Sequence, residues 1–546
     1  MKTGIIRIGN TFSESELLPA AEVLRRGGLV AFPTETVYGL GADALNENAC
    51  REIYAAKGRP SDNPLIVHVA EPSDAERYAF VPELYHKLAE AFLPGPLTVI
   101  MKKRDVVPKS VTGGLDTVAI RCPANPIAHA LIKLAGVPVA APSANVSGRP
   151  STTSFGHVLA DLDGKVDMLI DGGDCEIGLE STIVSIADGG MTLLRPGAVT
   201  VEQLSMFGDV AVDTGVTKKN DDGLPPLAPG MKYRHYAPRA PLTAIETDDA
   251  ARALKYIKRK RTGGAVAVLC CEEDAAVFAG YRVVTIGSKS DGQSQAKRLF
   301  AALRETDGSD FSHVFAVTPA LSGGIGLAIH NRLMKAAGYD VVKLPGITVI
   351  GVTGKSGSGK STFAAILAAK LKDAVTVDCD GINREMLSSD GEYIKLLSKI
   401  FGDGIMTGGR PDRKKLGSLV FSDPEKLKRL NSAALPRIVE RALSEIGEAE
   451  KSGKKYAVVD APLLFDTPLA DTCDVRITVV SDDGEREKRL LSRDGELPYL
   501  KARTKAQERD FSASDLTVTN TGTLSELEEK AEKIASSVSA GGFPRI

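Results

Sequence analysis

The sequence predicts a multidomain α/β protein, and three observations support this fold class. Short β-rich runs alternate with amphipathic helical stretches along most of the chain. A glycine-rich segment, Gly354–Ser361, stands between a β-branched run and a helical run. The length of 546 residues corresponds to three or four domains at roughly 150 residues each. Hydrophobic residues make up 43% and charged residues 25% of the chain, which allows a large buried core.

Residues 1–212 form the first predicted domain. Two amphipathic helices, Ser15–Arg26 and Asn48–Lys57, each end at glycine. Asp188-Gly189-Gly190 separates two β-rich runs, Thr182–Ile186 and Met191–Leu194, and predicts a β-hairpin. The remaining predicted strands are Leu29–Phe32, Leu65–Val69, Leu97–Met101, Val118–Arg121, Val137–Ala141 and Met168–Ile170. The domain is therefore expected to be mixed α/β.

Three further parts follow the first domain. Residues 213–241 contain five prolines and little periodic hydrophobicity, so they are predicted to be a linker, and a long linker in a compact protein is often a functional lid. Residues 242–345 show a second, shorter α/β pattern and are predicted to form a smaller domain. Residues 346–546 contain the glycine-rich segment and are predicted to form the last domain. The predicted elements of the smaller domain are strands Ala265–Leu269, Arg282–Ile286 and Val314–Val317, and helices Ser294–Glu305 and Gly326–Ala337.

The composition of the chain limits the classes of partner that the protein is expected to bind. A net charge of −2 gives no general argument for nucleic-acid or membrane binding, so direct tRNA contact is possible but not indicated. The seven cysteines show neither metal-site spacing nor a disulfide framework, which indicates reduced thiols. The N-terminus lacks a hydrophobic signal segment, and no stretch approaches the ~20 apolar residues of a membrane span. We expect a cytoplasmic protein that does not enter a membrane.

The first domain places cations and hydroxyls beside glycine or proline at the ends of its predicted strands. In an α/β sheet these strand ends normally form the ligand crevice. Each segment alone is ordinary turn chemistry, but their recurrence predicts a pocket for a polyanion. The segments are Pro33–Gly41, Lys57–Pro60, Asn63–Leu65, Ile120–Pro123, Ala141–Asn145, Ser147–Ser151, Gly178–Ile183 and Leu194–Gly197.

These segments resemble the YrdC-like L-threonylcarbamoyladenylate synthases. The resemblance covers residues 4–345, and the segments Ala228–Pro238 and Gly326–Arg332 look like those of the long, two-domain form of that family. It implies a mixed, twisted α/β sheet followed by a small Rossmann-like α/β domain. It also implies synthesis of threonylcarbamoyl-AMP from L-threonine, bicarbonate and ATP, with release of pyrophosphate. The product would pass to a tRNA threonylcarbamoyl transferase complex, which modifies an adenosine beside the anticodon.

The same resemblance implies the residues that bind each substrate. Threonine and its carbamate would contact Thr34, His68, Arg121, Ala141 and Ser181. The Tyr233–Tyr236 segment would close over the nucleotide. The carbamate oxygen is already anionic, so attack on the ATP α-phosphate needs alignment and charge neutralisation rather than a protein nucleophile. ATP would contact Lys57, Arg59, Ser61, Thr117, Ser143, Asn145, Ser151, Arg195, Tyr233 and Arg234.

Two alternatives stay open for this half of the chain. On its residue type alone, His68 on an apolar strand is more often a core histidine than a ligand. A non-catalytic RNA-binding or scaffold module would also present a basic concave surface. The net charge of −2 and the lack of an aromatic-rich basic stripe make the RNA-binding alternative weaker.

The glycine-rich segment reads Gly-Lys-Ser-Gly-Ser-Gly-Lys-Ser and matches the phosphate-binding P-loop. The β-branched run Ile347–Thr353 precedes it, and Ser361–Leu371 continues with apolar residues at helical spacing. Backbone N–H groups of such a loop surround a phosphate at a helix N-terminus, a lysine adds positive charge and a serine holds Mg²⁺. The sequence therefore predicts use of ATP or GTP, with binding residues Gly354, Gly357, Ser358, Gly359, Lys360, Ser361 and Thr362.

Carboxylates and arginines beyond the loop complete this predicted site. Val375–Asp380 is predicted to be a strand that ends with Asp378 and Asp380 on one side. Asp460, near the end of the apolar run Tyr456–Leu464, is suited to Mg²⁺ together with Ser361. The arginines on the helical stretches after residue 485 fit either a solvated helix face or a lid over the phosphates, and they are Arg486, Arg489, Arg493 and Arg503.

Residues 347–536 resemble the dephospho-CoA kinases through Thr353–Thr362, Asp378–Asp380, Asp460–Phe465, Arg493-Asp494 and Asn520. The resemblance implies a P-loop nucleotide kinase domain with a parallel sheet, which transfers the ATP γ-phosphoryl group to the ribose 3′-hydroxyl of dephospho-CoA. Asp380 would orient and deprotonate that hydroxyl, while Lys360, Mg²⁺ and Arg493 neutralise the moving charge.

The chain departs from the kinase pattern at four positions. Leu435 stands where the family usually has histidine, and the other departures are Lys355, Cys379 and Asp466. A kinase for another nucleoside or nucleotide is therefore the alternative. Taken together, the two resemblances predict a bifunctional enzyme that uses ATP and Mg²⁺ twice; the alternative is that one half is a catalytically inactive scaffold.

Overall fold

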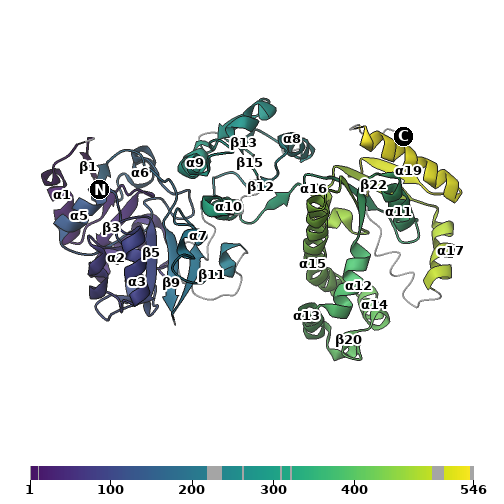
Figure 1. Cartoon of the computed structure of the whole chain (residues 1–546), viewed down its shortest axis with the longest axis horizontal. Coiled ribbons are helices and arrows are strands. Elements are labelled where there is room, and N and C mark those ends of the chain that lie inside the picture. The colour runs from purple at the N-terminus through teal and green to yellow at the C-terminus, as the bar shows by residue number, and fades with distance from the viewer. Residues whose placement is uncertain are drawn as a thin grey trace. The chain divides into compact units, whose positions relative to one another are not determined.

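The computed structural model describes residues 2–9, 11–187, 189–217, 236–260, 263–307, 310–319, 323–494 and 510–540, although the side chains of Arg493 and Asp494 are not described. The chain divides into two compact units, Met1–Val341 and Val342–Ile546 (Figure 1). Within the described ranges, no helix is both long and apolar enough to cross a membrane.

The first unit contains an eleven-stranded sheet of mixed direction. It contains antiparallel pairs such as β2–β3 and β5–β6 and parallel pairs such as β4–β6 and β5–β9. The predicted hairpin is present as the antiparallel pair β9–β10. In spatial order the strands are β1 (Gly4–Arg7), β8 (Met168–Asp171), β2 (Val30–Phe32), β3 (Gly39–Asp43), β7 (Val139–Ala140), β4 (Ile66–His68), β6 (Thr117–Arg121), β5 (Leu97–Lys102), β9 (Thr182–Ala187), β10 (Gly190–Arg195) and β11 (Val210–Val212).

Helices with ordinary capping signals pack against this sheet. Asn46 caps the start of α2 (Glu47–Lys57), and Gly58 ends it in the left-handed conformation. This stop places Lys57 and Arg59 on either side of the same turn. The other α-helices are α1 (Leu18–Arg25), α3 (Glu83–Phe92), α4 (Lys109–Thr112), α5 (Pro126–Ala135), α6 (Phe155–Leu162) and α7 (Val201–Leu204), and the 3₁₀ helices are Glu14–Leu17, Pro72–Arg77 and Thr214–Val216.

A second, five-stranded sheet completes the first unit and has the Rossmann-like character that the resemblance implied. Its pairs β12–β15, β13–β15 and β13–β14 are parallel. The core of this part also contains Val37 and Leu179 from the first domain. The strands, in spatial order, are β14 (Arg282–Thr285), β13 (Val266–Cys270), β15 (His313–Thr318), β12 (Leu242–Glu246) and β16 (Val341–Lys343), and the helices are α8 (Ala250–Arg259), 3₁₀ helix Glu272–Phe278, α9 (Gly292–Glu305) and α10 (Gly324–Ala336).

The second unit has a five-stranded parallel sheet. Side chains alternate along β17, so Val349 joins the core beneath α12–α15, while Ile350 and Val352 join the core beneath α11 and α19. The strands, in spatial order, are β18 (Ala374–Asp378), β21 (Tyr456–Asp460), β17 (Thr348–Thr353), β22 (Val475–Val480) and β23 (Leu516–Thr519). A small pair, β19 (Met406–Thr407) and β20 (Arg410–Pro411), lies apart from this sheet.

The helices of the second unit cover both faces of its sheet, with α11 and α19 close together on one of them (Figure 1). They are α11 (Lys360–Lys370), α12 (Cys379–Ser389), α13 (Gly391–Phe401), α14 (Arg413–Phe421), α15 (Pro424–Lys451), α16 (Leu469–Thr472), α17 (Asp483–Asp494) and α19 (Leu524–Ser539), with 3₁₀ helices Asp403–Ile405 and Leu464–Asp466. The predicted α/β fold class is confirmed in both units.

Two local predictions were wrong. Gly39–Gly41, predicted as part of a loop, belongs to β3, and a Cβ on Gly41 would lie 2.6 Å from Val139 Cγ1 and 2.7 Å from Phe32 Cε1. Glycine is required there by close packing rather than by a turn. Cys379 and Asp380 begin helix α12 instead of ending a strand, so Asp378 and Asp380 do not share one side of β18. An acidic side chain in the first turn of a helix is favoured by the helix dipole.

Candidate active sites

The ends of the central strands of the first unit surround an open cavity. Of the predicted ligands, Ser61 and Thr117 do not line it, and Tyr233 and Arg234 lie outside the described residues. The predicted ATP ligands that line it are Lys57, Arg59, Ser143, Asn145, Ser151 and Arg195, and the predicted threonine ligands are Thr34, His68, Arg121, Ala141 and Ser181. Residues from distant segments of the sequence thus meet around one cavity.

Two arginines supply positive charge along one part of the cavity. Arg195 donates from Nε to the Ser181 carbonyl at 3.0 Å and from Nη2 to Ser181 Oγ at 3.1 Å. Arg59 donates to the carbonyls of Asn63 and Pro64, at 3.3 and 3.0 Å. Burial lowers the pKa of each guanidinium to about 10, so both stay charged at neutral pH. These fixed cations are suited to phosphate oxygens.

Lys57 holds the backbone of the segment Ser143–Asn145 in place. Its Nζ donates to the carbonyl oxygens of both Ser143 and Asn145. Burial, followed by the neighbouring Arg59 charge, lowers its pKa well below the usual value. Ser143 Oγ in turn donates to Asn145 Oδ1 at 2.5 Å. The amine therefore fixes the backbone that presents the Ser143 and Asn145 side chains.

The part of the cavity with the predicted threonine ligands contains a buried ion pair. Arg121 Nη2 lies 2.6 Å from Glu35 Oε1, with both side chains almost fully buried. Burial raises the pKa of Glu35, but the charge and hydrogen bond of Arg121, with backbone hydrogen bonds, outweigh it and hold the pKa below its usual value. Ser181 Oγ shares a 2.7 Å hydrogen bond with Thr98. A guanidinium held in this way is positioned for a carboxylate or carbamate.

His68 is predicted to remain neutral throughout the physiological pH range. Burial, and then the Arg121 charge, lowers its pKa to about 3, against an unfolded-state value near 6.5. Its neutral form favours the folded state above about pH 6.5, and this stabilisation is lost as the pH falls from there toward 3. In ¹³C-histidine NMR, the resonance missing from His68→Asn should not move between about pH 8 and pH 5. A shift of this resonance with a midpoint near pH 6.5 would contradict the burial of His68.

The second domain contacts Glu180, a residue of the cavity wall, through Arg332, whose role the sequence did not reveal. Glu180 accepts from Ser151 Oγ at 2.5 Å and from Arg332 Nε at 3.1 Å, and it also hydrogen-bonds to Tyr236. Arg332, on α10, is 0% exposed and also donates to the Pro196 carbonyl. Burial raises the pKa of Glu180, but Arg332 and Arg195 outweigh it, so the carboxylate stays charged.

A close approach fixes the two domains of this unit against each other. Gly178 has a φ of 77°, and a Cβ there would lie 2.5 Å from the Cα of Lys297 on α9. Glu180 and Gly178 belong to a segment that the sequence marked for its glycine and hydroxyls, but no local signal identified α9 or α10 as the partner.

In the second unit, three side chains hold the P-loop by its carbonyl groups. Arg486 Nε donates to the Ser356 carbonyl at 3.1 Å, Arg489 Nη1 to Gly357 at 3.5 Å, and Asn520 Nδ2 to Ser358 at 2.8 Å. With the carbonyls occupied in this way, the N–H groups of the loop remain available to an anion. Arg486 is 3% exposed, so at this position the arginine run is not a solvated face.

Two polar atoms near the loop lack hydrogen-bond partners among the described residues: Ser358 Oγ and Arg486 Nη2. Both are buried donors, which normally require an acceptor. Gly357 and Gly359 have φ values of 81° and 89°, and a Cβ on Gly359 would lie 2.2 Å from Asn520 Nδ2. Both glycines are therefore needed for backbone conformation, and Gly359 is also needed for contact with Asn520.

Lys360 lies between two carboxylates beside the loop. Its Nζ is 2.9 Å from Asp460 Oδ1, 3.7 Å from Asp380 Oδ2 and 3.3 Å from Ser361 Oγ. Asp460 is buried, whereas the Asp380 side chain is 55% exposed and accessible to an incoming substrate. Ser361 and Thr362 are exposed at the start of α11, and the predicted catalytic Arg493 has no described side chain.

These residues fit a magnesium ion bound mainly by substrate and water. Lys360 Nζ contacts both Ser361 Oγ and Asp460 Oδ1, so a hydroxyl and a carboxylate oxygen converge on one place. Mg²⁺ in phosphoryl-transfer enzymes typically takes one or two protein oxygens and completes its shell with phosphates and water. Within the described ranges, no group of three or more His, Cys, Asp or Glu side chains is suited to a metal held by protein alone.

The second unit also has a cavity of about 950 Å³, which lies between α14, the first half of α15 and the segment Asp466–Pro468. Leu435, where the resemblance led us to expect histidine, lines it together with Val439 and Leu427. The wall is largely apolar with a few polar groups, among them Asn431 and Lys428. Such a surface suits a long substrate with both apolar and polar parts.

Comparison with protein families gives three matches in chain order. Residues 22–197 match the model described as telomere recombination. Residues 199–338 match the model of the threonylcarbamoyl-AMP synthase C-terminal domain. Residues 348–526 match the dephospho-CoA kinase model.

Individual relatives also match the two parts of the chain separately. Threonylcarbamoyl-AMP synthase of Bacillus subtilis (strain 168) is 46% identical over 61% of this chain and 95% of its own length. Dephospho-CoA kinase of Corynebacterium efficiens is 33% identical over 35% of this chain and 96% of its own length. The crystal structure of P. abyssi Sua5 complexed with L-threonine is 43% identical and aligns with a TM-score of 0.59, covering 63% of this chain and 100% of that one.

Proposed function

Because the chain belongs to the threonylcarbamoyl-AMP synthases through its first unit and to the dephospho-CoA kinases through its second, we propose a residue-level mechanism for each reaction. The chain is a bifunctional enzyme. One activity makes threonylcarbamoyl-AMP and pyrophosphate from L-threonine, bicarbonate and ATP, for tRNA modification. The other phosphorylates the ribose 3′-hydroxyl of dephospho-CoA with ATP. The non-catalytic alternatives are not favoured.

In the synthase we propose that Arg121, Ser181 and Thr34 hold the threonine carboxylate and carbamate, with neutral His68 beside them. Arg59, Arg195, Ser143, Asn145 and Ser151 hold ATP. The carbamate oxygen attacks the α-phosphorus, the new O–P bond forms and pyrophosphate leaves with the bonding electrons. The convergence of these groups in one cavity, with Arg195 buried, Arg59 half-buried and both charged, is the observation that supports this assignment.

In the kinase we propose that the P-loop and Lys360 hold the phosphates of ATP. Asp380 accepts the proton of the ribose 3′-hydroxyl as its oxygen attacks the γ-phosphorus, and ADP leaves. When bound at Ser361 and Asp460, Mg²⁺ would neutralise phosphate charge. The 3.7 Å separation of Asp380 Oδ2 from Lys360 Nζ supports this arrangement, because it puts a base beside the phosphate-binding cation. The Leu435 cavity would receive the rest of the acceptor.

We further propose the domain limits 1–212, 213–241, 242–345 and 346–546, with transfer of the first product to a tRNA threonylcarbamoyl transferase complex. A cytoplasmic location is supported by the seven buried cysteine thiols, since such thiols are stable in a reducing compartment.

Each of the two activities should be measurable on its own in one preparation of the intact protein, according to the substrates supplied. Incubation with ATP, Mg²⁺ and dephospho-CoA should give ADP and CoA, and incubation with ATP, Mg²⁺, L-threonine and bicarbonate should give pyrophosphate and the AMP adduct. Pyrophosphate release should need threonine. Failure of the first incubation would indicate another phosphoryl acceptor, and failure of the second would restore the scaffold or RNA-binding alternative for the first unit.

A further inference from the structure

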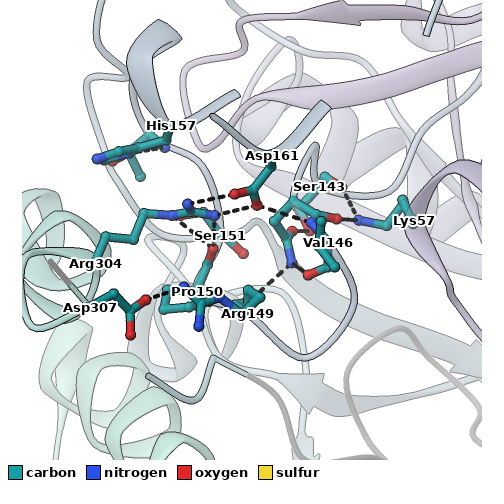
Figure 2. A network of polar contacts seen from close by, with 12 residues as sticks. Lys57, Ser143, Val146, Arg149, Pro150, Ser151, His157, Asp161, Arg304 and Asp307 are labelled. Carbon is teal, nitrogen blue, oxygen red and sulfur yellow. Dashed lines mark hydrogen bonds and ion pairs between the residues drawn. The ribbon is translucent and has the colours of Figure 1, made fainter. Parts of the chain in front are cut away.

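The C-terminal end of helix α9 reaches from the second domain to the loop Asn145–Ser151 of the synthase cavity (Figure 2). Arg304, whose side chain is 9% exposed, forms a bidentate ion pair with Asp161, at 3.1 Å to Oδ1 and 2.8 Å to Oδ2. Its Nε also donates to the carbonyls of Pro150 and Ser151, at 3.1 and 3.3 Å. One guanidinium thus joins helix α6 to the end of the loop that carries Ser151.

Asp161 transmits this contact to the other end of the loop. Its Oδ2 accepts from the Val146 N–H at 3.0 Å. Asn145 Nδ2 then donates to the Val146 and Arg149 carbonyls, at 2.8 and 3.0 Å, which closes the loop upon itself. Burial raises the pKa of Asp161, but Arg304 outweighs this effect, so the carboxylate is charged in the folded protein.

Asp307, two residues beyond α9, holds the same loop and the chain that enters the second domain. It accepts from the Arg149 guanidinium and, at 2.7 Å, from the Arg239 N–H. Ala237 N–H donates to the Gly148 carbonyl at 3.0 Å. The Tyr236 ring lies 5.1 Å from the Phe300 ring of α9, between their centroids. The end of α9 therefore fixes the loop and residues 236–239 together.

We propose that Arg304 and Asp307 are positioning residues for ATP in the synthase reaction, although neither lines the cavity; this inference rests on the assignment of Ser143, Asn145 and Ser151 to ATP. Without Arg304, the Asp161 carboxylate would keep its buried position but lose its ion pair, and two loop carbonyls would lose a donor. A buried charge without its partner is costly, so the loop would rearrange. The threonine ligands come from other segments and would stay in place.

The decisive variant is Arg304→Ala in the full chain, assayed by threonine-dependent pyrophosphate release. We expect the KM for ATP to rise roughly ten- to a hundredfold and the KM for threonine to change by less than about twofold. Arg304→Lys should fall between, because an ammonium cannot reproduce the bidentate contact. The matched control is Lys289→Ala, which breaks the 2.7 Å ion pair with Asp274 inside the second domain and leaves the loop untouched.

A second measurement makes the test independent of turnover. Hydrogen exchange of the amides of residues 143–151 should accelerate in Arg304→Ala and not in Lys289→Ala. The midpoint of thermal unfolding of the second unit should be the same in both variants as in the unsubstituted protein. Unchanged exchange, an unchanged KM for ATP, or equal increases in both KM values would overturn the inference. If the unsubstituted protein releases no pyrophosphate, the proposed function fails, while the exchange data still decide whether α9 orders the loop.

Discussion

Replacing Lys360 with methionine is expected to abolish dephospho-CoA phosphorylation and leave the synthase reaction unchanged. Lys360 is the ammonium beside the P-loop that contacts Asp460 at 2.9 Å and faces Asp380 at 3.7 Å. Its loss would remove the cation that offsets charge on the transferring phosphoryl group and leave Asp460 buried without its ion pair. We expect kcat to fall roughly a thousandfold, or ~4 kcal/mol, measured as CoA formed from dephospho-CoA.

The loop itself offers a matched control. Lys355 is another lysine of the same loop, half-buried, and Lys355→Met should retain kinase activity within about threefold. Asp380→Asn should lower kcat while leaving the KM for ATP near its original value, because Asp380 is assigned to the acceptor hydroxyl. Kinase turnover by Lys360→Met comparable to that of Lys355→Met would exclude the proposed role of the P-loop lysine.

Replacing Arg59 with alanine is expected to impair the synthase reaction and to leave the kinase reaction unchanged. Arg59 follows the left-handed stop at Gly58, is held by the Asn63 and Pro64 carbonyls and lines the synthase cavity. Its removal should lower threonine-dependent pyrophosphate release roughly a hundredfold or more, since a fixed cation near the phosphates is lost. CoA formation by the same preparation should not change.

Arg51→Ala provides the comparison for Arg59. Arg51 lies on the exposed face of the same helix, α2, and pairs with Glu47 at 2.9 Å, a contact that contributes little at the surface. We expect it to have normal synthase activity. Equal losses in the two variants would indicate damage to α2 rather than loss of a phosphate ligand.

Local sequence was sufficient wherever the chemistry resides in one segment. The P-loop between β17 and α11 was predicted because a strand, glycines with a terminal lysine and a helix follow each other directly. The cavity of the first unit was predicted because polar residues beside glycine and proline recur at strand ends. The predicted ATP ligands Ser61 and Thr117 do not line that cavity, and membership in the right segment did not determine where their side chains lie.

Contacts between distant segments could not be predicted in this way. The hydrogen bonds of Glu180 with Ser151, Arg332 and Tyr236 join three parts of the chain, and Arg304 meets Asp161 across 143 positions. Strand β3 was missed because its glycines read as turn residues, whereas they are there for packing against Phe32 and Val139. The helical start at Cys379 was missed because a β-branched run led into it without a break.

The contact at Gly178 also bears on how this protein can be divided by gene engineering or by evolution. Gly178 lies against the backbone of α9, and the adjacent Leu179, fully buried, belongs with Val37 to the core of the second domain. A fragment ending at residue 212 would expose both apolar side chains and would lack Arg332 beside Glu180. We therefore expect the first domain of this chain to be less stable when it is cut from the second, and a product shortened at residue 212 to tend to aggregate.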